Sequence, residues 1–568
     1  MQPSQPNRAE PSRAVSRRAR SNRAPLLLWA APVLSAILLE LPFPLAGPLP
    51  VWRTVFAWFG LAPLLVALLS AGCVNGPRSV RKSFLLAYLC GFLWYMGNCY
   101  WVRDTMARYG DMPAIFPVLL LIGYSAVLGL YFGLFGLGVA LVRRASGSTR
   151  WGLAAAPILW AGIELAASRI TSVPWDQLGY SQVDNGLVNQ LAPWTGVYGI
   201  SFVLVAVNAL IAGGLLLDRC SGRRVWGIAG VALMAAGASG VLIPPPNPVT
   251  TATAVLIQPN LDVAGDNRWS GPGEWDTHMA QFTQLAKETC KQFIAGIPQT
   301  GAPTVAPACA ALPAHADLVA WPESPAPFDE SDPRFQHSLA KIAQSVQAPI
   351  IVGSIGWTFD PSAQDWNYYN SALVIGADGA RAGRYDKIHL VPFGEYIPFQ
   401  NLLTFAHKLT GRVSRFTRGD GPKVFRLASA TGDAHRYGIF ICYEAVFADE
   451  VRHFAQLGAD VLVNISDDGW YGDTSAPWQH LNMVRMRAVE YRRWILRSPN
   501  NGITAVIDPY GQVRQSIPRH QADSLAAQFA YRDDVTFYTA HGDVFGWTCA
   551  LLGLAILCWS LKGLPATK

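Results

Sequence analysis

Charged side chains are scarce in this chain: Asp, Glu, Lys and Arg together make up 15% of its 568 residues. Because soluble domains average about 25% charged residues, this composition excludes an ordinary soluble protein. Hydrophobic residues reach 51%, a balance that is typical of a polytopic membrane protein.

Metal-binding spacings are also missing. The nine cysteines and ten histidines form no CxxC pair and no His/Cys cluster, so no metal site is indicated and no cofactor is implied. The net charge of +7 largely reflects basic membrane loops, so nucleic-acid binding is not indicated either. The hydrophilic part contains no internal repeat.

What the sequence does contain is a series of long apolar runs, which predict eight membrane-spanning helices. They lie near Leu26–Ala46, Thr54–Gly72, Ser83–Val102, Pro113–Leu141, Trp151–Ser168, Thr195–Leu217, Val225–Ile243 and Val544–Leu561. Basic residues gather in the amino-terminal tail and in alternate loops, for example at Arg81, Arg143 and Arg223. Since cytoplasmic loops retain Lys and Arg, both termini are predicted to be cytoplasmic and the hydrophilic part to lie outside.

Five parts follow from this layout. They are a basic cytoplasmic tail (1–24), a seven-helix transmembrane region (25–243), an external domain (244–542), a carboxyl-terminal transmembrane helix (543–562) and a cytoplasmic tail (563–568).

The external domain alternates short β-branched runs with helix-like polar stretches, which is the pattern of an α/β domain. Strands are predicted at Ala254–Gln258, Leu318–Trp321, Ile350–Ser354, Ser371–Ile375, Tyr437–Ile441, Val461–Ile465 and Thr504–Ile507. Helices are predicted at His278–Ala295, Arg334–Val346, Asp449–Leu457 and Trp478–Trp494. About 300 residues can bury one sizeable core.

Three residues of this domain stand out as a set. Glu323 and Cys442 each follow a predicted strand, where α/β sheets commonly place their sites, and Lys387 lies in the run YDKIHLVPFGEY. A thiol with a reference pKa of about 8.5 needs a base or a cation to react at neutral pH. Glu323 can take the proton, and Lys387 can hold the thiolate and then an oxyanion. His389 and His480 are expected to be structural.

At these residues the chain resembles the carbon-nitrogen hydrolase (nitrilase) superfamily, whose members use a Glu-Lys-Cys triad on an αββα sandwich. More narrowly, it resembles the bacterial apolipoprotein N-acyltransferase family. The matching runs are VPWDQLGYSQ at Val173, QPN at Gln258, WPES at Trp321, YDKIHLVPFGEYIP at Tyr385, ICYE at Ile441, NISDDGWYGDTSAPWQHLNMVRMRAVEYRR at Asn464 and NNGITAVID at Asn500.

This resemblance covers nearly the whole chain after the tail. It implies a polytopic α-helical membrane protein of about eight transmembrane helices that carries an external nitrilase-like αββα sandwich. It also implies a place in the bacterial inner membrane, with the catalytic domain in the periplasm.

The activity that the resemblance implies is a two-step acyl transfer, the last step of lipoprotein maturation. Cys442 attacks the sn-1 acyl ester of a phospholipid, releases a lysophospholipid and keeps the acyl group as a thioester. The α-amine of the S-diacylglyceryl cysteine of an apolipoprotein then takes it. The implied partners are therefore a phospholipid donor, a diacylglyceryl-modified apolipoprotein acceptor and membrane lipids.

Further site residues are implied by the same resemblance. Glu395 matches a second carboxylate that positions the lysine or the reacting groups, and Tyr443 and Glu444 match supporting positions beside the nucleophile. The family also has a substrate-contacting tryptophan on a mobile loop after the QPN strand. Trp269 and Trp275 both fit that position, and the spacing does not decide between them.

Two other functions are compatible with parts of the sequence. A membrane-tethered nitrilase-type amidase would use the same triad and pass the acyl group of a small amide to water, although one anchoring helix would then suffice. A transporter or lipid-binding receptor would need no chemistry, which the intact triad argues against.

Four residues are left open. Cys290 and Cys309, which flank a Pro/Ala/Gly-rich stretch at Gly296–Pro313, fit a disulfide and two free thiols equally well. Glu40 and Glu164 lie in predicted spans, where an ionisable group is costly and often functional, and neither is assigned.

Overall fold

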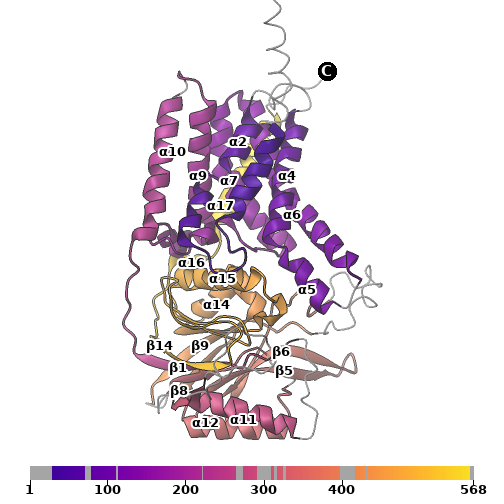
Figure 1. The fold of residues 1–568 in the computed structure, drawn as a ribbon, viewed down its shortest axis with the longest axis vertical. Coiled ribbons are helices and arrows are strands. Elements are labelled where there is room, and N and C mark those ends of the chain that lie inside the picture. Colours follow the sequence, from indigo (N-terminus) through magenta and orange to yellow (C-terminus); the bar gives the residue numbers. More distant parts are fainter. Residues whose placement is uncertain are drawn as a thin grey trace, which may run out of the picture.

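The computed structural model describes residues 28–70, 79–110, 113–220, 222–261, 263, 273–290, 309–311, 316–323, 328–396, 416–428 and 432–562. Within these ranges the chain forms a helical bundle stacked on an α/β domain (Figure 1). The bundle leads into the domain through α10 and receives the chain back through α17.

Six helices of the described chain are long and apolar enough to cross a membrane. They are the 3-10 segment Val51–Trp58 continued by α2 (Ala62–Leu69), α6 (Ile115–Ser146), α7 (Thr149–Ala166) with its extension to Thr171, α9 (Val197–Leu216), α10 (Arg223–Ala238) with its extension to Leu242, and α17 (Val544–Lys562). Beside them lie the helix Leu28–Glu40, α4 (Ser79–Asn98), α5 (Trp101–Tyr109) and α8 (Ala192–Thr195).

The prediction of about eight spanning helices is therefore wrong in number, because six of the described helices meet the requirement. The helix Leu28–Glu40 is shorter than the roughly 20 residues that a span needs. In α4 the length is sufficient, but Arg81 and Lys82 at one end and Asn98 at the other lower its mean hydropathy. The other six predicted spans each coincide with one of the six helices.

The α/β domain contains two six-stranded sheets. The first, in the order β14-β1-β4-β5-β6-β7, consists of β1 (Ala252–Gln258), β4 (Leu318–Ala320), β5 (Ile350–Asp360), β6 (Asp365–Ile375), β7 (Arg381–Asp386) and β14 (Asp523–Phe529). The second, in the order β13-β12-β11-β10-β9-β8, consists of β8 (Val424–Ala428), β9 (Ala434–Ile441), β10 (Val461–Ser466), β11 (Ile495–Pro499), β12 (Thr504–Ile507) and β13 (Val513–Ile517).

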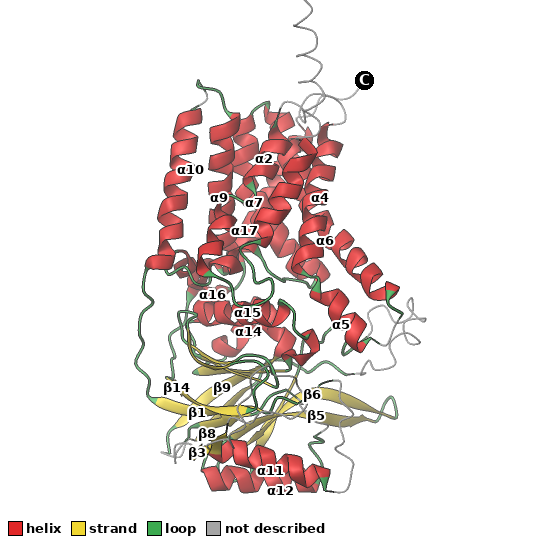
Figure 2. Cartoon of the chain, in the orientation of Figure 1, coloured by secondary structure: helices red, strands yellow, loops and turns green. Residues whose placement is uncertain are grey.

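Alternation along the strands explains why the sheets stack as they do. In β1, Ala254 and Leu256 join the core that the two sheets share, whereas Val255 and Ile257 pack with the outer helices α11 (Glu274–Lys287) and α12 (Pro333–Val346). The second sheet is covered by α14 (Ala448–Gln456) and α15 (Ala476–Tyr491), which face the bundle together with the short α16 (Phe537–His541) (Figure 2). The result is the expected αββα sandwich.

All seven predicted strands are confirmed, with longer bounds for several of them. The helix predicted to begin at His278 ends earlier than expected, because Glu288–Cys290 forms a short strand, β2. This strand pairs antiparallel with β3 (Cys309–Ala311), and Cys290 is the register partner of Cys309. Antiparallel partners have Cα atoms about 4.5–5.5 Å apart, which a disulfide can bridge, so the backbone allows both states. The stretch between these strands lies outside the described residues.

Candidate active site

Three strand ends bring the predicted triad together. Glu323 lies beyond β4 and Lys387 follows β7, both in the first sheet, whereas Cys442 follows β9 of the second sheet. The three residues are 7%, 1% and 6% exposed, respectively. The site therefore lies between the sheets, where side chains from both can meet with little contact with water.

Lys387 is held between two carboxylates. Its Nζ donates to Glu323 Oε1 at 3.1 Å and to Glu395 Oε1 at 2.9 Å. The Nδ2 of Asn370, in β6, donates to the same two oxygens at 2.6 Å each. Burial acts to lower the pKa of Lys387, but the charges of Glu323 and Glu395 outweigh it and raise this pKa well above its usual value. Lys387 is thus a fixed cation, and Glu395 has the geometry of a residue that positions it.

Cys442 has a backbone conformation that is uncommon for a residue with a side chain. Its φ is +48°, in the left-handed region that few non-glycine residues adopt, and it opens the 3-10 turn Cys442–Val446. His480 Nε2 lies 3.0 Å from the carbonyl oxygen of Cys442, and His480 Nδ1 lies 3.1 Å from Asp468 Oδ1. The structural role expected of His480 therefore takes a definite form, since it holds the turn that carries the thiol.

The charge around the thiol determines how it can react. Burial raises the pKa of Cys442 well above its usual value, Glu323 raises it further, and Lys387 opposes both effects. The resting site therefore contains a neutral thiol beside a carboxylate and an ammonium group. Because a thiol reacts as its thiolate, any reaction at Cys442 would require loss of this proton, and Glu323 is a carboxylate close enough to the thiol to affect its pKa.

Glu444 connects the cysteine turn to the segment that carries Lys387. Its Oε2 accepts a hydrogen bond from Ile441 N at 2.6 Å. Its Oε1 accepts from Tyr385 Oη at 2.8 Å, from Ile388 N at 2.6 Å and from His389 N at 3.2 Å. Burial raises the pKa of Glu444 to about 7, against the effect of these donors. The sequence predicts a supporting role for Glu444 beside Cys442, and these hydrogen bonds give that prediction a structural basis.

A Glu444→Gln variant should unfold at a clearly lower temperature than the wild type. Glutamine has one acceptor oxygen and two donor hydrogens, so its amide nitrogen would face the Ile441 or Ile388 N–H, and a buried unpaired donor costs about 1–3 kcal/mol. The matched control is Glu450→Gln, because the Glu450 side chain is partly exposed and accepts a hydrogen bond from His389 Nδ1 at 2.9 Å. Equal melting temperatures for both variants would contradict the role given to Glu444.

Tyr443 connects the same turn to the membrane bundle. Its hydroxyl donates to the carbonyl oxygen of Ser172 at 3.2 Å, in the loop that follows the extension of α7. Its ring packs edge-on against Phe447, with centroids 5.2 Å apart, and it belongs to the hydrophobic cluster of the bundle. Cys442 is therefore connected to the bundle through the residue next to it.

The two candidate tryptophans have different positions. Trp275 lies in α11, where the Arg334 guanidinium stacks over its ring at 4.9 Å from the centroid, and it packs on the core beneath the outer helices. That position is on the outer side of the first sheet. Trp269 lies outside the described residues, so the choice between the two remains a prediction.

Two polar residues of the site were not predicted from the sequence. Asn370 bridges Glu323 and Glu395, as described above, and the backbone N–H of Asp467 donates to Glu323 Oε2 at 2.9 Å. Burial, together with the nearby Glu323, raises the pKa of Asp467 well above its usual value. The available signal for Asn370 was one polar residue just before the apolar run of a predicted strand, which is too common to identify a site.

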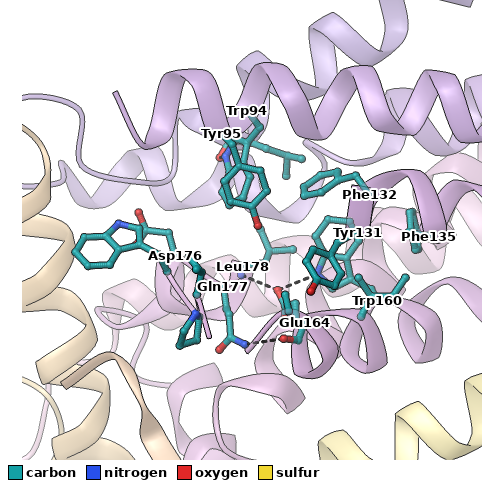
Figure 3. Close-up of a pocket in the computed structure, with 16 residues that line it drawn as sticks. Trp94, Tyr95, Tyr131, Phe132, Phe135, Trp160, Glu164, Asp176, Gln177 and Leu178 are labelled. Atoms are coloured by element: carbon teal, nitrogen blue, oxygen red, sulfur yellow. Dashed lines mark hydrogen bonds between the residues drawn. The ribbon is translucent and has the colours of Figure 1, made fainter. Parts of the chain in front are cut away.

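A second polar cluster lies in the bundle, around a small cavity of about 40 Å³ with room for about three water molecules. Figure 3 shows Glu164 and Asp176 among aromatic side chains that include Tyr95 and Tyr131. Glu164 accepts hydrogen bonds from Trp160 Nε1 and Leu178 N, both at 2.9 Å. Of the two carboxylates left unassigned from the sequence, Glu164 thus has hydrogen-bond partners inside the bundle.

This cluster continues into the α/β domain. Asn98 Nδ2 donates to Asp176 Oδ2 at 2.9 Å, and Gln479 Nε2, from α15, donates to Asn98 Oδ1 at 3.0 Å. Trp175 Nε1 donates to Gln479 Oε1 at 2.9 Å. Because Gln479 precedes His480, the bundle contacts the residue next to the one that holds the Cys442 carbonyl.

Comparison with known proteins covers both parts of the chain. Residues 35–210 match the family described as the apolipoprotein N-acyltransferase N-terminal domain, and residues 258–530 match the carbon-nitrogen hydrolase family. An apolipoprotein N-acyltransferase of Geobacter metallireducens is 34% identical, over 92% of this chain and 93% of the relative. One of Photobacterium profundum is 30% identical, over 85% of this chain and 87% of the relative. Among solved structures, Saccharomyces cerevisiae Nit3, a member of branch 10 of the nitrilase superfamily, matches with 14% identity and a TM-score of 0.33, covering 53% of this chain and 98% of that chain.

Proposed function

Because the chain belongs to the apolipoprotein N-acyltransferase family, we propose that Cys442 carries an acyl group between two lipid substrates, with Glu323 as the base and Lys387 as the stabilising cation. The chain is a multi-pass membrane protein and an acyltransferase of the nitrilase superfamily. The observation that carries the proposal is the contact of Lys387 with Glu323 and Glu395 beside the buried thiol.

The first step is transfer of the acyl group from a phospholipid to the enzyme. Glu323 takes the proton of the Cys442 thiol, and the sulfur attacks the carbonyl carbon of the sn-1 ester. A C–S bond forms and the C–O bond breaks. The departing glycerol oxygen takes the proton from Glu323, so a lysophospholipid leaves and the charges balance. Lys387 faces the negative charge that develops on sulfur and on the carbonyl oxygen.

The second step transfers the acyl group to the α-amine of an S-diacylglyceryl cysteine. The amine nitrogen attacks the thioester carbonyl, a C–N bond forms and the C–S bond breaks. Glu323 takes the proton that the amine loses and returns it to the sulfur, which restores the starting thiol. A cysteine suits this order of events because amines attack thioesters more readily than oxygen esters.

The test of this function separates transfer from hydrolysis. Purified protein is incubated with phospholipid. Intact-mass spectrometry should show one added acyl chain, and peptide mass spectrometry should place it on the peptide that contains Cys442. Addition of a diacylglyceryl-cysteinyl peptide should discharge the adduct into an N-acylated peptide. Release of free fatty acid, with the peptide left unmodified, would instead indicate a hydrolase such as the tethered amidase.

We further propose that the α/β domain lies on the periplasmic face of the bacterial inner membrane, with both chain ends in the cytoplasm. Basic residues at the helix ends remote from the domain, such as Arg81 in α4, Arg144 in α6 and Arg223 in α10, support this orientation (Figure 1). Near the domain, by contrast, Arg169 is neutralised by Asp543 at 2.5 Å.

Cysteine labelling in intact cells should report this orientation. Cys220 is exposed, lies between α9 and α10 at the remote end, and should react with a membrane-impermeant maleimide only after lysis. A cysteine introduced as Ala363→Cys, in the exposed hairpin between β5 and β6, should react in cells whose outer membrane is permeabilised. The reverse pattern, read by peptide mass spectrometry, would show that the orientation is inverted.

A further inference from the structure

A groove of about 370 Å³ lies between α5 and the loop that follows β10, beside the active site. It is lined by residues of two segments, Asp104–Tyr109 without Met106, and Trp470–Thr474. Tyr109 Oη donates to the carbonyl oxygen of Gly469 at 2.8 Å, and the Tyr109 and Trp470 rings meet edge-on with centroids 5.0 Å apart. The groove is thus formed where the bundle and the catalytic domain join.

Two guanidinium groups converge at Gly472, within this groove. Arg108 Nη1 lies 2.8 Å from the position that a Cβ on Gly472 would occupy, and Arg519 Nη2 donates to the Gly472 carbonyl oxygen at 2.8 Å. Burial lowers the pKa of Arg519, and the like charge of Arg108 acts in the same direction. Gly472, at φ +56°, leaves the space that the Arg108 guanidinium uses. Two cations are therefore close together at Gly472, with Arg108 in the lining of the groove and Arg519 behind Gly472.

The carboxylates of the groove do not neutralise both cations. Asp104 is bonded to Arg103, and Asp473 is shared by His520 at 2.7 Å and by Arg519 at 3.3 Å. Arg108 has no salt bridge within the described part of the chain. In the same described part, the buried Thr105 hydroxyl and the buried Arg519 Nε have no hydrogen-bond partner. These unpaired groups include N–H and O–H donors, which suit an anion that brings acceptor oxygens.

The groove is also close to the reacting thiol. Tyr471, at its inner wall, packs edge-on against Trp101 with centroids 5.3 Å apart and against His480 with centroids 5.9 Å apart. His480 in turn holds the Cys442 carbonyl at 3.0 Å. On the other side, α5 follows directly after α4 of the bundle. An amphiphile whose chains lie along the bundle can therefore place its polar part in the groove and its ester near the thiol.

We propose that this groove binds the phosphodiester of the phospholipid acyl donor, with Arg108 and Arg519 as the residues that contact its phosphate oxygens. The inference rests on the proposed function, since it names the part of the donor that this surface recognises. The planar guanidinium groups present paired donors to a phosphate, and a phosphodiester carries a single negative charge that matches the one guanidinium left without a carboxylate. Arg108 and Arg519 are then specificity residues that act in the first step only.

The test compares two acyl donors that differ in the phosphate. One is a phospholipid, and the other is a p-nitrophenyl ester of the same fatty acid; acylation of Cys442 is followed by intact mass. In Arg108→Gln and in Arg519→Gln, KM for the phospholipid should rise by about tenfold or more, whereas KM for the nitrophenyl ester should not change. Arg103→Gln is the matched control, because Arg103 lies on the same helix, is half exposed and pairs with Asp104.

The possible outcomes separate the groove from the function. Equal losses with both donors, or no loss with the phospholipid, would overturn the groove assignment. A site for free phosphate would show inhibition of both donors by inorganic phosphate, lost in Arg108→Gln, with an unchanged phospholipid KM; that result would also overturn it. Arg519→Lys keeps the charge and serves if Arg519→Gln does not fold. Cys442→Ala that is still acylated with either donor would refute the proposed function itself.

Discussion

Replacing Cys442 with alanine is expected to abolish acyl transfer and to remove the acyl adduct from the protein. Other buried cysteines of the described chain, such as Cys90 and Cys549, lie in the helical bundle. Loss of a covalent nucleophile removes both steps at once, so the rate should fall by at least about 10³-fold. The measurement is N-acylated peptide per unit time, with intact mass for the adduct.

Two companion variants make this result specific. Cys549→Ala removes a buried thiol of α17 that is 4% exposed and distant in the chain from the site, and it should retain normal activity. Cys442→Ser keeps a nucleophilic atom at the position, but any oxygen ester formed there would be discharged slowly by an amine. An adduct that persists in Cys442→Ala would place the acyl group elsewhere and refute the mechanism.

Replacing Glu323 with glutamine should slow formation of the acyl-enzyme by about 10²–10⁴-fold, the usual contribution of a general base. The variant keeps an oxygen for Lys387 and Asn370 but cannot take the thiol proton. Since burial and Glu323 together raise the pKa of Cys442, loss of the Glu323 charge should lower this pKa. Part of the lost rate should therefore return at high pH, where the thiol ionises without a base.

The control for this prediction is Glu330→Gln. Glu330 is another buried carboxylate of the domain, 5% exposed, and it pairs with Arg381 at 2.7 Å rather than with Lys387. The control should lose thermal stability and keep its acylation rate. Equal loss of acylation in Glu323→Gln and Glu330→Gln would show that the effect comes from general damage to the fold, and the base assignment would then fail.

Glu323 and Cys442 could be predicted from the sequence because each follows a predicted strand, whereas Lys387 was identified from the run YDKIHLVPFGEY, since the strand before it, β7, was not predicted. The strands before Glu323 and Cys442 are short, continuous runs of apolar residues, and such runs are typical of buried strands. The resemblance to a family supplied the roles of Glu395, Tyr443 and Glu444, which no spacing rule gives. The contacts among these residues form only when the two sheets pack together. They therefore depend on the tertiary structure and cannot be read from the sequence.

The strands that were missed show where the pattern is insufficient. In β11, Arg497 is completely buried and pairs with Asp468, so a charged residue occupies a central strand and hides its apolar run. At the edge of the first sheet, β7 contains Arg381 and Arg384, whose charges are paired with Glu330. Buried ion pairs of this kind are formed only by the folded chain, so the sequence of one strand does not reveal them.

The helix count failed for a related reason. A scan for apolar runs treats every hydrophobic helix as equivalent, but Leu28–Glu40 and α4 are partly enclosed by other helices. Trp94 in α4, for example, is 6% exposed and donates to the Leu39 carbonyl oxygen at 3.2 Å. Such helices are stabilised by packing within the protein, so their composition is less constrained by contact with lipid.

The hydrogen bonds that Tyr443 makes to Ser172 and Gln479 makes to Asn98 fix the position of Cys442 relative to the helices of the bundle. The bundle would then select substrates by position, because only an ester or amine held at the level of Cys442 along the bundle can reach the thiol. Two substrates with different head groups can share such a site, provided that each is embedded in the same bilayer to the same level. Water-soluble esters, which lack that alignment, would have to find the site by diffusion alone.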